Sequence, residues 1–236
     1  MKMKKRTRFC SCLLLLSLLL ALALPAQAQE GKYVALTLDD GPSGRFTRRL
    51  LEGLEQRNVK ATFFLCGYRM ELYPELTQLI VEKGHEVGLH GFTHDSMAEM
   101  SESKLHKELE DTAALLFKLS GLKATLLRPP GGSITKLVRG EAEKQKLSIV
   151  TWSVDPKDWA TIEAKTITRR VVEDTCPGDV ILLHDMSDSS VDAALAIVDQ
   201  LTQEGYTFVT VSRLAELTQT DLEWGKVYSA FSMEIR

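Results

Sequence analysis

The chain has no apolar run long enough to span a bilayer, which takes about 20 residues. Its most apolar stretch, residues 9–24, is shorter; five Lys or Arg residues precede it, and Pro-Ala-Gln-Ala follows at residues 25–28. This order of a basic, an apolar and a small-residue part is typical of a secretory signal peptide. We therefore predict a signal peptide over residues 1–28, cleaved after Ala28, with an uncleaved membrane anchor as the alternative.

An excess of basic charge is also absent. The formal net charge of the 236-residue chain is -3, and it becomes -8 without residues 1–28, which hold five basic and no acidic side chains. An acidic exported protein is a poor candidate for nucleic-acid binding. We therefore expect no nucleic-acid partner and, after cleavage, no stable membrane span. The sequence carries no signal for an oligomeric state.

Cysteine is scarce as well. Cys10 and Cys12 precede most of the apolar run, which is the wrong place for a lipid-modified cysteine after cleavage. Cys66 and Cys176 remain, and such a pair in an exported protein is compatible with a disulfide. Cys66, however, ends an apolar segment in which a small buried thiol fits well. We expect two free, partly buried thiols, with a disulfide as the alternative.

No G-x-G-x-x-G sequence follows the first expected strand, which removes the usual reason to predict a dinucleotide-binding fold. Hydrophobic periodicity predicts seven strands, with helices between them, at residues 33–38, 59–65, 85–89, 125–127, 147–154, 180–183 and 206–211. Such alternation requires a parallel sheet covered by helices. We predict an α/β fold: one domain over residues 29–217, forming a barrel of seven or eight parallel strands, and a C-terminal tail over residues 218–236. An open doubly wound sheet is the alternative.

Polar side chains follow the carboxyl ends of most of the expected strands. They are Asp39 and Asp40 after the first, His90 and His94 after the third, Arg128 after the fourth, Asp155, Asp158 and Trp159 after the fifth, and His184 after the sixth. Parallel barrels build their active sites at this edge. Because scattered core or surface residues would not share that position, we predict an active site there.

A metal site is predicted from the first two of these groups. The adjacent carboxylates Asp39 and Asp40 repel each other unless a positive group lies beside them. His90 and His94 are four residues apart, which places both imidazoles on one side of a helical turn. Two histidines and one of the aspartates form the three-ligand set of a catalytic zinc site with an open position for water. The alternative is that the Asp-Asp-Gly-Pro sequence only forms a turn or a helix cap.

Asp158 and His184 suggest a second pair. Taken singly, the segment from Asp155 to Trp159 is explained by a turn with a buried Trp, and His184 by a core histidine whose hydrogen bonds are satisfied. Together they place a carboxylate and an imidazole on neighbouring strands, where the acid can hold the histidine protonated. We predict that they act together as a proton donor and its support.

Five segments match the motifs of a known family in the family's order. They are Thr37-Leu38-Asp39-Asp40-Gly41, His90-Gly91-Phe92-Thr93-His94, Arg128-Pro129-Pro130-Gly131, Asp155-Pro156-Lys157-Asp158-Trp159 and Leu182-Leu183-His184. The chain thus resembles the polysaccharide deacetylases, the NodB-homology group of carbohydrate esterases, over about residues 33–217. Each motif alone is modest, but five in order are specific.

The resemblance implies a distorted (β/α) barrel that binds a divalent cation through Asp40, His90 and His94. The cation would be zinc in most members, with cobalt or another divalent ion as the alternative. The resemblance makes Asp39 the general base and His184 the general acid.

The family pattern also implies supporting roles for other residues. Arg128 would hold Asp39 ionised, and Asp158 would orient His184 and favour its charged form. Trp159 and Leu182 would wall the pocket for the acetyl methyl group.

One position departs from the family pattern. The third motif usually ends in an aromatic residue, commonly Tyr, whereas Gly131 and Gly132 follow the two prolines here. If the family uses the main-chain N–H of that residue as an oxyanion donor, Gly131 still supplies one, on a more mobile chain. The missing ring removes any packing or sugar contact that it makes elsewhere, so we expect a different substrate preference.

The resemblance predicts a secreted or cell-envelope-associated enzyme that hydrolyses N-acetyl groups of a glycan. The substrate would be peptidoglycan or a chitin-like polymer containing N-acetylglucosamine or N-acetylmuramic acid. One alternative is an O-acetyl esterase acting on xylan or another acetylated polysaccharide. Another is a non-catalytic glycan-binding barrel, against which the presence of Asp39, Asp40 and His184 argues.

Overall fold

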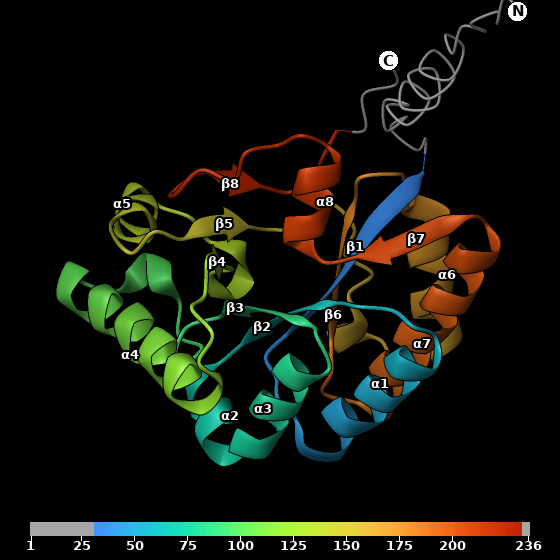
Figure 1. Cartoon of the computed structure of the whole chain (residues 1–236), viewed down its shortest axis with the longest axis horizontal. Coiled ribbons are helices and arrows are strands. Elements are labelled where there is room, and N and C mark those ends of the chain that lie inside the picture. Colours follow the sequence, from blue (N-terminus) through green and yellow to red (C-terminus); the bar gives the residue numbers. More distant parts are fainter. Residues whose placement is uncertain (1–30, 233–236) are drawn as a thin grey trace, which may run out of the picture. The chain divides into compact units, whose positions relative to one another are not determined.

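The computed structural model describes residues 31–232, and the strands of this range form one eight-stranded sheet (Figure 1). They are β1 (Lys32–Asp39), β2 (Thr62–Leu65), β3 (Glu86–Leu89), β4 (Leu126–Leu127), β5 (Ser148–Val150), β6 (Val180–His184), β7 (Tyr206–Val209) and β8 (Val227–Tyr228). The first seven lie within or next to the segments predicted as strands. The eighth lies in the C-terminal tail.

The sheet is parallel and curls back on itself. Its order is β6-β1-β2-β3-β4-β5-β8, with β7 paired to the amino half of β1, and all pairings between these strands are parallel. Just after β5, Val154 forms a bridge to Ile181 of β6, and the Leu182 N–H donates to the Val154 oxygen at 2.9 Å. This contact joins the two sides of the sheet into the predicted distorted (β/α) barrel. It also explains why the segment predicted as one strand, 147–154, is divided into β5 and a separate bridge.

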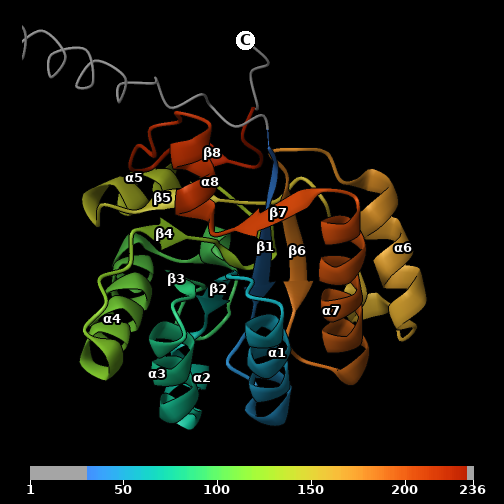
Figure 2. The same cartoon turned by 45° about the vertical axis from the view of Figure 1, so that its right-hand side comes forward.

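The described part of the chain contains eight α-helices, most of which cover the outside of this sheet. They are α1 (Gly44–Gln56), α2 (Gly67–Leu72), α3 (Pro74–Glu82), α4 (Glu102–Ser120), α5 (Lys136–Lys144), α6 (Ala164–Asp174), α7 (Asp188–Gln203) and α8 (Val211–Leu217). Helices α4, α3, α1, α7 and α6 stand next to one another around it, as Figure 2 shows. The short α2 was not predicted from the sequence.

Helix α4 follows its local sequence signals closely. The Ser101 hydroxyl caps the amino end by accepting the Lys104 N–H, and Gly121 ends the helix with a left-handed φ of 72°. Leu105 and Leu109 lie on its buried face, as their spacing predicted. The helix therefore presents a fixed face to the loop that follows β3.

Strand β1 divides the core into two parts. Leu36 and Leu38 pack in the cluster beneath the helices, whereas Ala35 belongs to a second cluster inside the barrel, to which α8 and Phe231 contribute. Side chains alternate along a strand, so Asp39 points to the same side as Ala35. Asp40, in contrast, lies beyond the strand with a positive φ of 71°. The two adjacent aspartates therefore diverge.

The C-terminal tail, whose conformation the sequence left open, packs on the barrel over its described part. Ile149 of β5 pairs with Val227 of β8, and the Phe231 side chain is 2% exposed. The tail therefore completes one end of the barrel interior.

Cys66 and Cys176 are both free, as predicted; Cys66 is buried, but Cys176 is exposed rather than partly buried. The predicted signal peptide, residues 1–28, lies outside the described residues. Within residues 31–232, no helix combines the length and the apolar character that a membrane crossing needs.

Candidate active site

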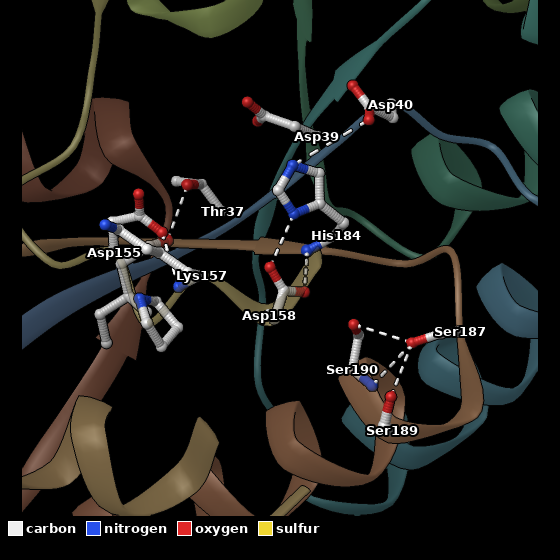
Figure 3. Close-up of polar contacts among 12 residues, drawn as sticks. Thr37, Asp39, Asp40, Asp155, Lys157, Asp158, His184, Ser187, Ser189 and Ser190 are labelled. Atoms are coloured by element: carbon white, nitrogen blue, oxygen red, sulfur yellow. Dashed lines mark hydrogen bonds and ion pairs between the residues drawn. The ribbon is translucent and has the colours of Figure 1, made fainter. Parts of the chain in front are cut away.

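The polar residues that follow the strands meet at the carboxyl edge of the barrel, and Figure 3 shows Asp39, Asp40, Asp158 and His184 among them. Asp39 ends β1, His90 directly follows β3, Arg128 directly follows β4, and His184 ends β6. Asp158 opens a short 3-10 helix, Asp158–Ala160, in the connection after β5. The predicted clustering at one edge is therefore present.

Arg128 anchors Asp39 from inside the barrel. Its Nη1 donates to Asp39 Oδ1 and to Thr37 Oγ1, both at 2.7 Å, while Nε and Nη2 donate to the main-chain oxygens of Val150 and Thr151 at 3.0 and 2.7 Å. The side chain is fully buried, and this burial lowers the pKa of Arg128, which the neighbouring Asp39 opposes. A guanidinium keeps its charge in proteins, so the buried pair is compensated and Asp39 is held in one position.

Asp40, His90 and His94 bring three possible metal-ligand atoms together. Nε2 of His90 lies 3.2 Å and Nε2 of His94 lies 3.0 Å from Asp40 Oδ1, and the ligand atoms all fall within 4.8 Å of one another. Asp40 and His94 adopt left-handed φ angles of 71° and 68°, which side-chain-bearing residues rarely hold outside turns and functional sites. The structure thus groups the three residues that were predicted to bind a metal.

The hydrogen bonds of His90 favour a cation in this group. Its Nδ1 lies 2.6 Å from the main-chain oxygen of Arg128, so Nδ1 carries the proton, because a carbonyl only accepts. In the neutral ring, Nε2 then has a lone pair that faces the Asp40 carboxylate. Within the described residues, the buried Oδ1 of Asp40 accepts no hydrogen bond. Two electron-rich atoms facing each other fit a divalent cation, and nitrogen with oxygen ligands suits zinc and similar ions.

The charge of Asp40 matches this role. Burial raises the pKa of a carboxyl group, but when no cation is bound and the Nε2 atoms of His90 and His94 carry protons, their hydrogen bonds and positive charge outweigh burial and hold the pKa of Asp40 far below its usual range. The Asp40 carboxylate also raises the pKa of His94. Asp40 is therefore ionised at neutral pH, as a metal ligand must be.

His184 and Asp158 form a second hydrogen-bonded pair (Figure 3). His184 Nδ1 lies 2.8 Å from Asp158 Oδ1, and the His184 main-chain N–H donates to Oδ2 of the same carboxylate at 2.9 Å. Nε2 of His184 is thereby turned toward Asp40 Oδ2, 4.0 Å away. Burial lowers the pKa of His184, but the hydrogen bond and charge of Asp158, with smaller contributions from Asp39 and Asp40, outweigh burial and raise this pKa to about 9. In the sheet register His184 pairs with Asp39, so the candidate acid and base lie on adjacent strands.

The three residues predicted to line the substrate pocket differ in exposure. Leu182 is 4% exposed within β6, whereas Trp159 is 69% exposed at the rim. Gly131 has a φ of 64° and open space where a side chain would begin. Asp155 remains in a turn, because its carboxylate accepts the Lys157 N–H at 2.8 Å. The turn interpretation thus accounts for Asp155.

The glycine pair of the third motif lies beside a tryptophan. A Cβ atom at Gly132 would lie 2.9 Å from the ring of Trp152, so a side chain there would displace it. The guanidinium of Arg128 lies 5.7 Å from the centroid of the same ring. Trp152 therefore packs against the turn where the sequence lacks the usual aromatic residue.

Sequence reasoning missed two buried acids near the site. Asp185 is fully buried directly after His184; its carboxylate accepts the Thr47 hydroxyl, and its Oδ1 lies 2.7 Å from where a Cβ of Gly41 would be. Burial raises the pKa of Asp185 to about 6. The other acid, Glu108, is 5% exposed on α4. Its position on the buried face of that helix was the available signal.

Known proteins are similar to this chain in both sequence and fold. The family profile described as polysaccharide deacetylase matches residues 26–150. Peptidoglycan-N-acetylmuramic acid deacetylase PdaC of Bacillus subtilis is 39% identical over 79% of this chain and 39% of its own length. A peptidoglycan-N-acetylglucosamine deacetylase of Bacillus cereus is 38% identical over 82% of this chain and 74% of its own length. The chain thus spans well under half of PdaC and about three quarters of the second relative.

Solved structures agree with these sequence matches. A structure of the Bacillus subtilis PdaC deacetylase superimposes with a TM-score of 0.77 and 38% identity, covering 80% of this chain and 93% of that one. A family 4 acetyl xylan esterase from Clostridium thermocellum, in complex with a cobalt ion, gives a TM-score of 0.80 at 30% identity, covering 86% of this chain and 100% of that one. With the profile match over more than half of the residues, these findings establish that the chain belongs to the polysaccharide deacetylase family.

Proposed function

We propose that this protein is a metal-dependent deacetylase that hydrolyses N-acetyl groups of a cell-wall glycan, with peptidoglycan as the first candidate. One observation carries the proposal: one oxygen of the Asp40 carboxylate faces His90 and His94, and the other faces His184. Its Oδ1 is within 3.2 Å of Nε2 of His90 and His94, and its Oδ2 is 4.0 Å from Nε2 of His184. A candidate metal site and a candidate acid therefore face the same space.

Asp40, His90 and His94 would hold the cation, for which zinc is the first candidate and cobalt the second. When bound, such an ion polarises a substrate oxygen and lowers the pKa of water. The lone-pair orientation of His90 and the unpartnered buried oxygen of Asp40 support this assignment. The cobalt complex of the related acetyl xylan esterase supports a divalent ion without fixing its identity.

Asp39 would act as the general base that removes a proton from the attacking water. Its Oδ1 is bound to Arg128, and its Oδ2 lies 3.7 Å from His90 Nε2, at the edge of the proposed metal site. Arg128 provides a positive charge 2.7 Å from Asp39 Oδ1, so the buried carboxylate has a compensating partner that fixes its position. The base is therefore held beside the position that water would occupy.

His184 would act as the general acid. An amine leaves poorly as an anion, so the amide C–N bond breaks more easily when the nitrogen receives a proton. Asp158 holds the proton on Nδ1 and directs Nε2 into the site, and together with Asp39 and Asp40 it raises the pKa of His184 to about 9. The His184 imidazolium would give the Nε2 proton to the departing sugar amine, and acetate would be the other product.

The neighbouring residues would complete the substrate pocket. Leu182 and Trp159 would contact the acetyl methyl group and the sugar, and the main-chain N–H of Gly131 would donate to the developing oxyanion. The open space at Gly131 and the nearby Trp152 support a pocket shaped differently from those of members with an aromatic residue at this position. Residues 1–28 would export the protein to the cell envelope, where its substrate lies.

A substrate panel tests this proposal. Zinc-loaded protein would be incubated with chitooligosaccharides, purified peptidoglycan and acetylated xylan, and loss of acetyl groups would be followed by mass spectrometry. We expect acetate release from the N-acetylated glycans. Activity confined to xylan would instead indicate the O-acetyl esterase, and no turnover of any polymer together with glycan binding would indicate a non-catalytic barrel.

A further inference from the structure

The three residues between the two proposed metal-binding histidines, Gly91, Phe92 and Thr93, are held from two sides. We refer to them as the histidine loop. On one side lies the amino end of α2, whose Gly67 N–H donates to the Gly91 oxygen and whose Tyr68 N–H donates to the Phe92 oxygen, both at 2.9 Å. The carbonyl groups of the loop are therefore fixed to α2.

Glu108 of α4 holds the other side of the histidine loop. A single carboxylate oxygen, Oε1, accepts the Phe92 N–H at 2.8 Å, the Thr93 N–H at 2.6 Å and the Thr93 hydroxyl at 2.8 Å. Glu108 is only 5% exposed. Because a buried acid needs hydrogen-bond partners, these three donors are what make its burial tolerable.

The close approach of the loop to Glu108 depends on Gly91. This residue has a φ of 84°, and a Cβ there would lie 2.9 Å from the Met97 side chain and 3.2 Å from Glu108 Oε1. Any other residue would thus be strained and would push against the acceptor oxygen. The glycine therefore allows the loop to approach close enough to hydrogen-bond with Glu108.

The two histidines differ in how much they depend on this arrangement. His90 is buried, and its Nδ1 is bound to the main-chain oxygen of Arg128. The His94 side chain is 42% exposed; its main chain has a positive φ of 68°, and it directly follows Thr93. The position of the His94 imidazole is therefore set largely by the loop that Glu108 holds.

We propose that Glu108 is a positioning residue for the metal site, which fixes the histidine loop so that Nε2 of His94 faces Asp40. The inference rests on the metal site of the proposed function. Glu108 forms no hydrogen bond with Asp40, His90 or His94 themselves, and it acts through the main chain of Phe92 and through Thr93. Groups that orient metal ligands in this indirect way typically contribute about 10- to 100-fold to metal affinity.

The test is the affinity of metal-free protein for Zn²⁺ alone, measured by isothermal titration calorimetry with a competing chelator. We expect Glu108→Ala to weaken Zn²⁺ binding, with a dissociation constant about 10- to 100-fold higher than that of the parent protein. Glu108→Gln keeps one acceptor oxygen without its charge, so its loss should be smaller. Glu110→Gln is the matched control, because Glu110 lies on the same helix with an exposed side chain, and it should leave the affinity unchanged.

A second control separates positioning from a general loss of stability. Thr112 is buried on α4, and its hydroxyl donates to the Glu108 main-chain oxygen at 2.6 Å rather than to the histidine loop. Thr112→Ala should lower the melting temperature of the metal-free protein but leave Zn²⁺ affinity unchanged. If Glu108→Ala behaves in the same way, with a lower melting temperature and unchanged affinity, the inference is overturned.

Two further outcomes are distinguishable. If Glu108→Ala does not fold, Glu108→Gln and Thr93→Ala decide the question, because each removes only part of the hydrogen bonding; weaker Zn²⁺ binding in both supports the inference, and unchanged binding in both overturns it. If the parent protein itself binds no Zn²⁺, no affinity is left for Glu108 to support, so the inference falls together with the metal site of the proposed function. If the parent binds Zn²⁺ and Glu108→Ala binds it with the same affinity, the inference about Glu108 is contradicted while the proposed metal site stands.

Discussion

Replacing Asp158 by Asn tests how this carboxylate controls the proposed acid, His184. Asn has a similar size and still accepts one hydrogen bond, but it removes the negative charge that lies 2.8 Å from Nδ1. His184 has an ordinary pKa of 6.5, which the site raises to about 9. An acid must be protonated to work, so activity is present below this pKa and is lost as the pH rises through it. If the pKa of His184 returns toward 6.5, the change corresponds to about 3 kcal/mol.

The size of the effect should therefore depend on pH. From the protonated fractions at the two pKa values, the ratio of parent to variant kcat/KM should grow from about 1.3 at pH 6 to about 4 at pH 7 and about 30 at pH 8. The assay is the rate of acetate release from a chitooligosaccharide by zinc-saturated protein over this range. The control is Glu163→Gln, because Glu163 is an exposed acid in the same connection; this variant should show the same pH dependence of kcat/KM as the parent. A parent-to-variant ratio that stays constant from pH 6 to pH 8 would refute the reasoning.

Three other predictions concern the base, the metal and the stability of the barrel. Asp39→Asn should lower kcat by about 10²- to 10⁴-fold while calorimetry finds the same Zn²⁺ affinity; a variant with parental kcat would exclude Asp39 as the base. Chelation should abolish turnover and lower the melting temperature, and added Zn²⁺ should restore both, because a ligand of the folded state stabilises it; turnover that survives chelation would contradict the metal site. His85 is buried and neutral, its Nδ1 accepts the Ala61 N–H at 3.1 Å, and burial lowers the pKa of His85 to about 4. The unfolded chain then binds the proton more readily, so the free energy of unfolding should fall by about 2 kcal/mol between pH 7 and pH 5. Urea denaturation of the parent and of His85→Gln checks this, since an equal fall in both would assign the loss to other groups.

The fold and the candidate metal site were predictable because their signals are local. Alternating strand and helix periods require a parallel sheet, and the ends of parallel strands meet at one edge. Asp40, His90 and His94 could therefore be grouped from their positions after β1 and β3. The direction of Asp39 follows from the alternation of side chains along β1, whereas the direction of Asp40 depends on its positive φ beyond the strand.

What the sequence could not provide are contacts between distant segments. The bridge from Val154 to β6 and the pairing of β8 with β5 leave no periodic pattern in the chain. The roles of Glu108 and Asp185 depend on loops that only the fold brings to them. For Glu108, an acid next to Leu105 and Leu109 on the buried face of α4 was visible, but the Phe92 and Thr93 groups that donate to it were not.

The packing at the third motif is a further example. The absence of the usual aromatic residue was evident from Gly131 and Gly132, yet the sequence did not indicate that Trp152 packs against the same turn. Trp152 lies about 20 residues further along the chain, just beyond β5. Its placement depends on the register between β4 and β5, which spacing alone does not define.

The central claim, that a cation held by Asp40, His90 and His94 makes this barrel a deacetylase, is tested most directly by one titration. Metal-free protein would be mixed with a soluble N-acetylglucosamine oligomer, Zn²⁺ would be added in steps, and acetate release would be measured after each step. The proposed site predicts no release without metal, a linear rise, and a plateau at a single Zn²⁺ per chain. Acetate release by the metal-free protein, or tight Zn²⁺ binding without release from this oligomer or from peptidoglycan, would contradict the claim.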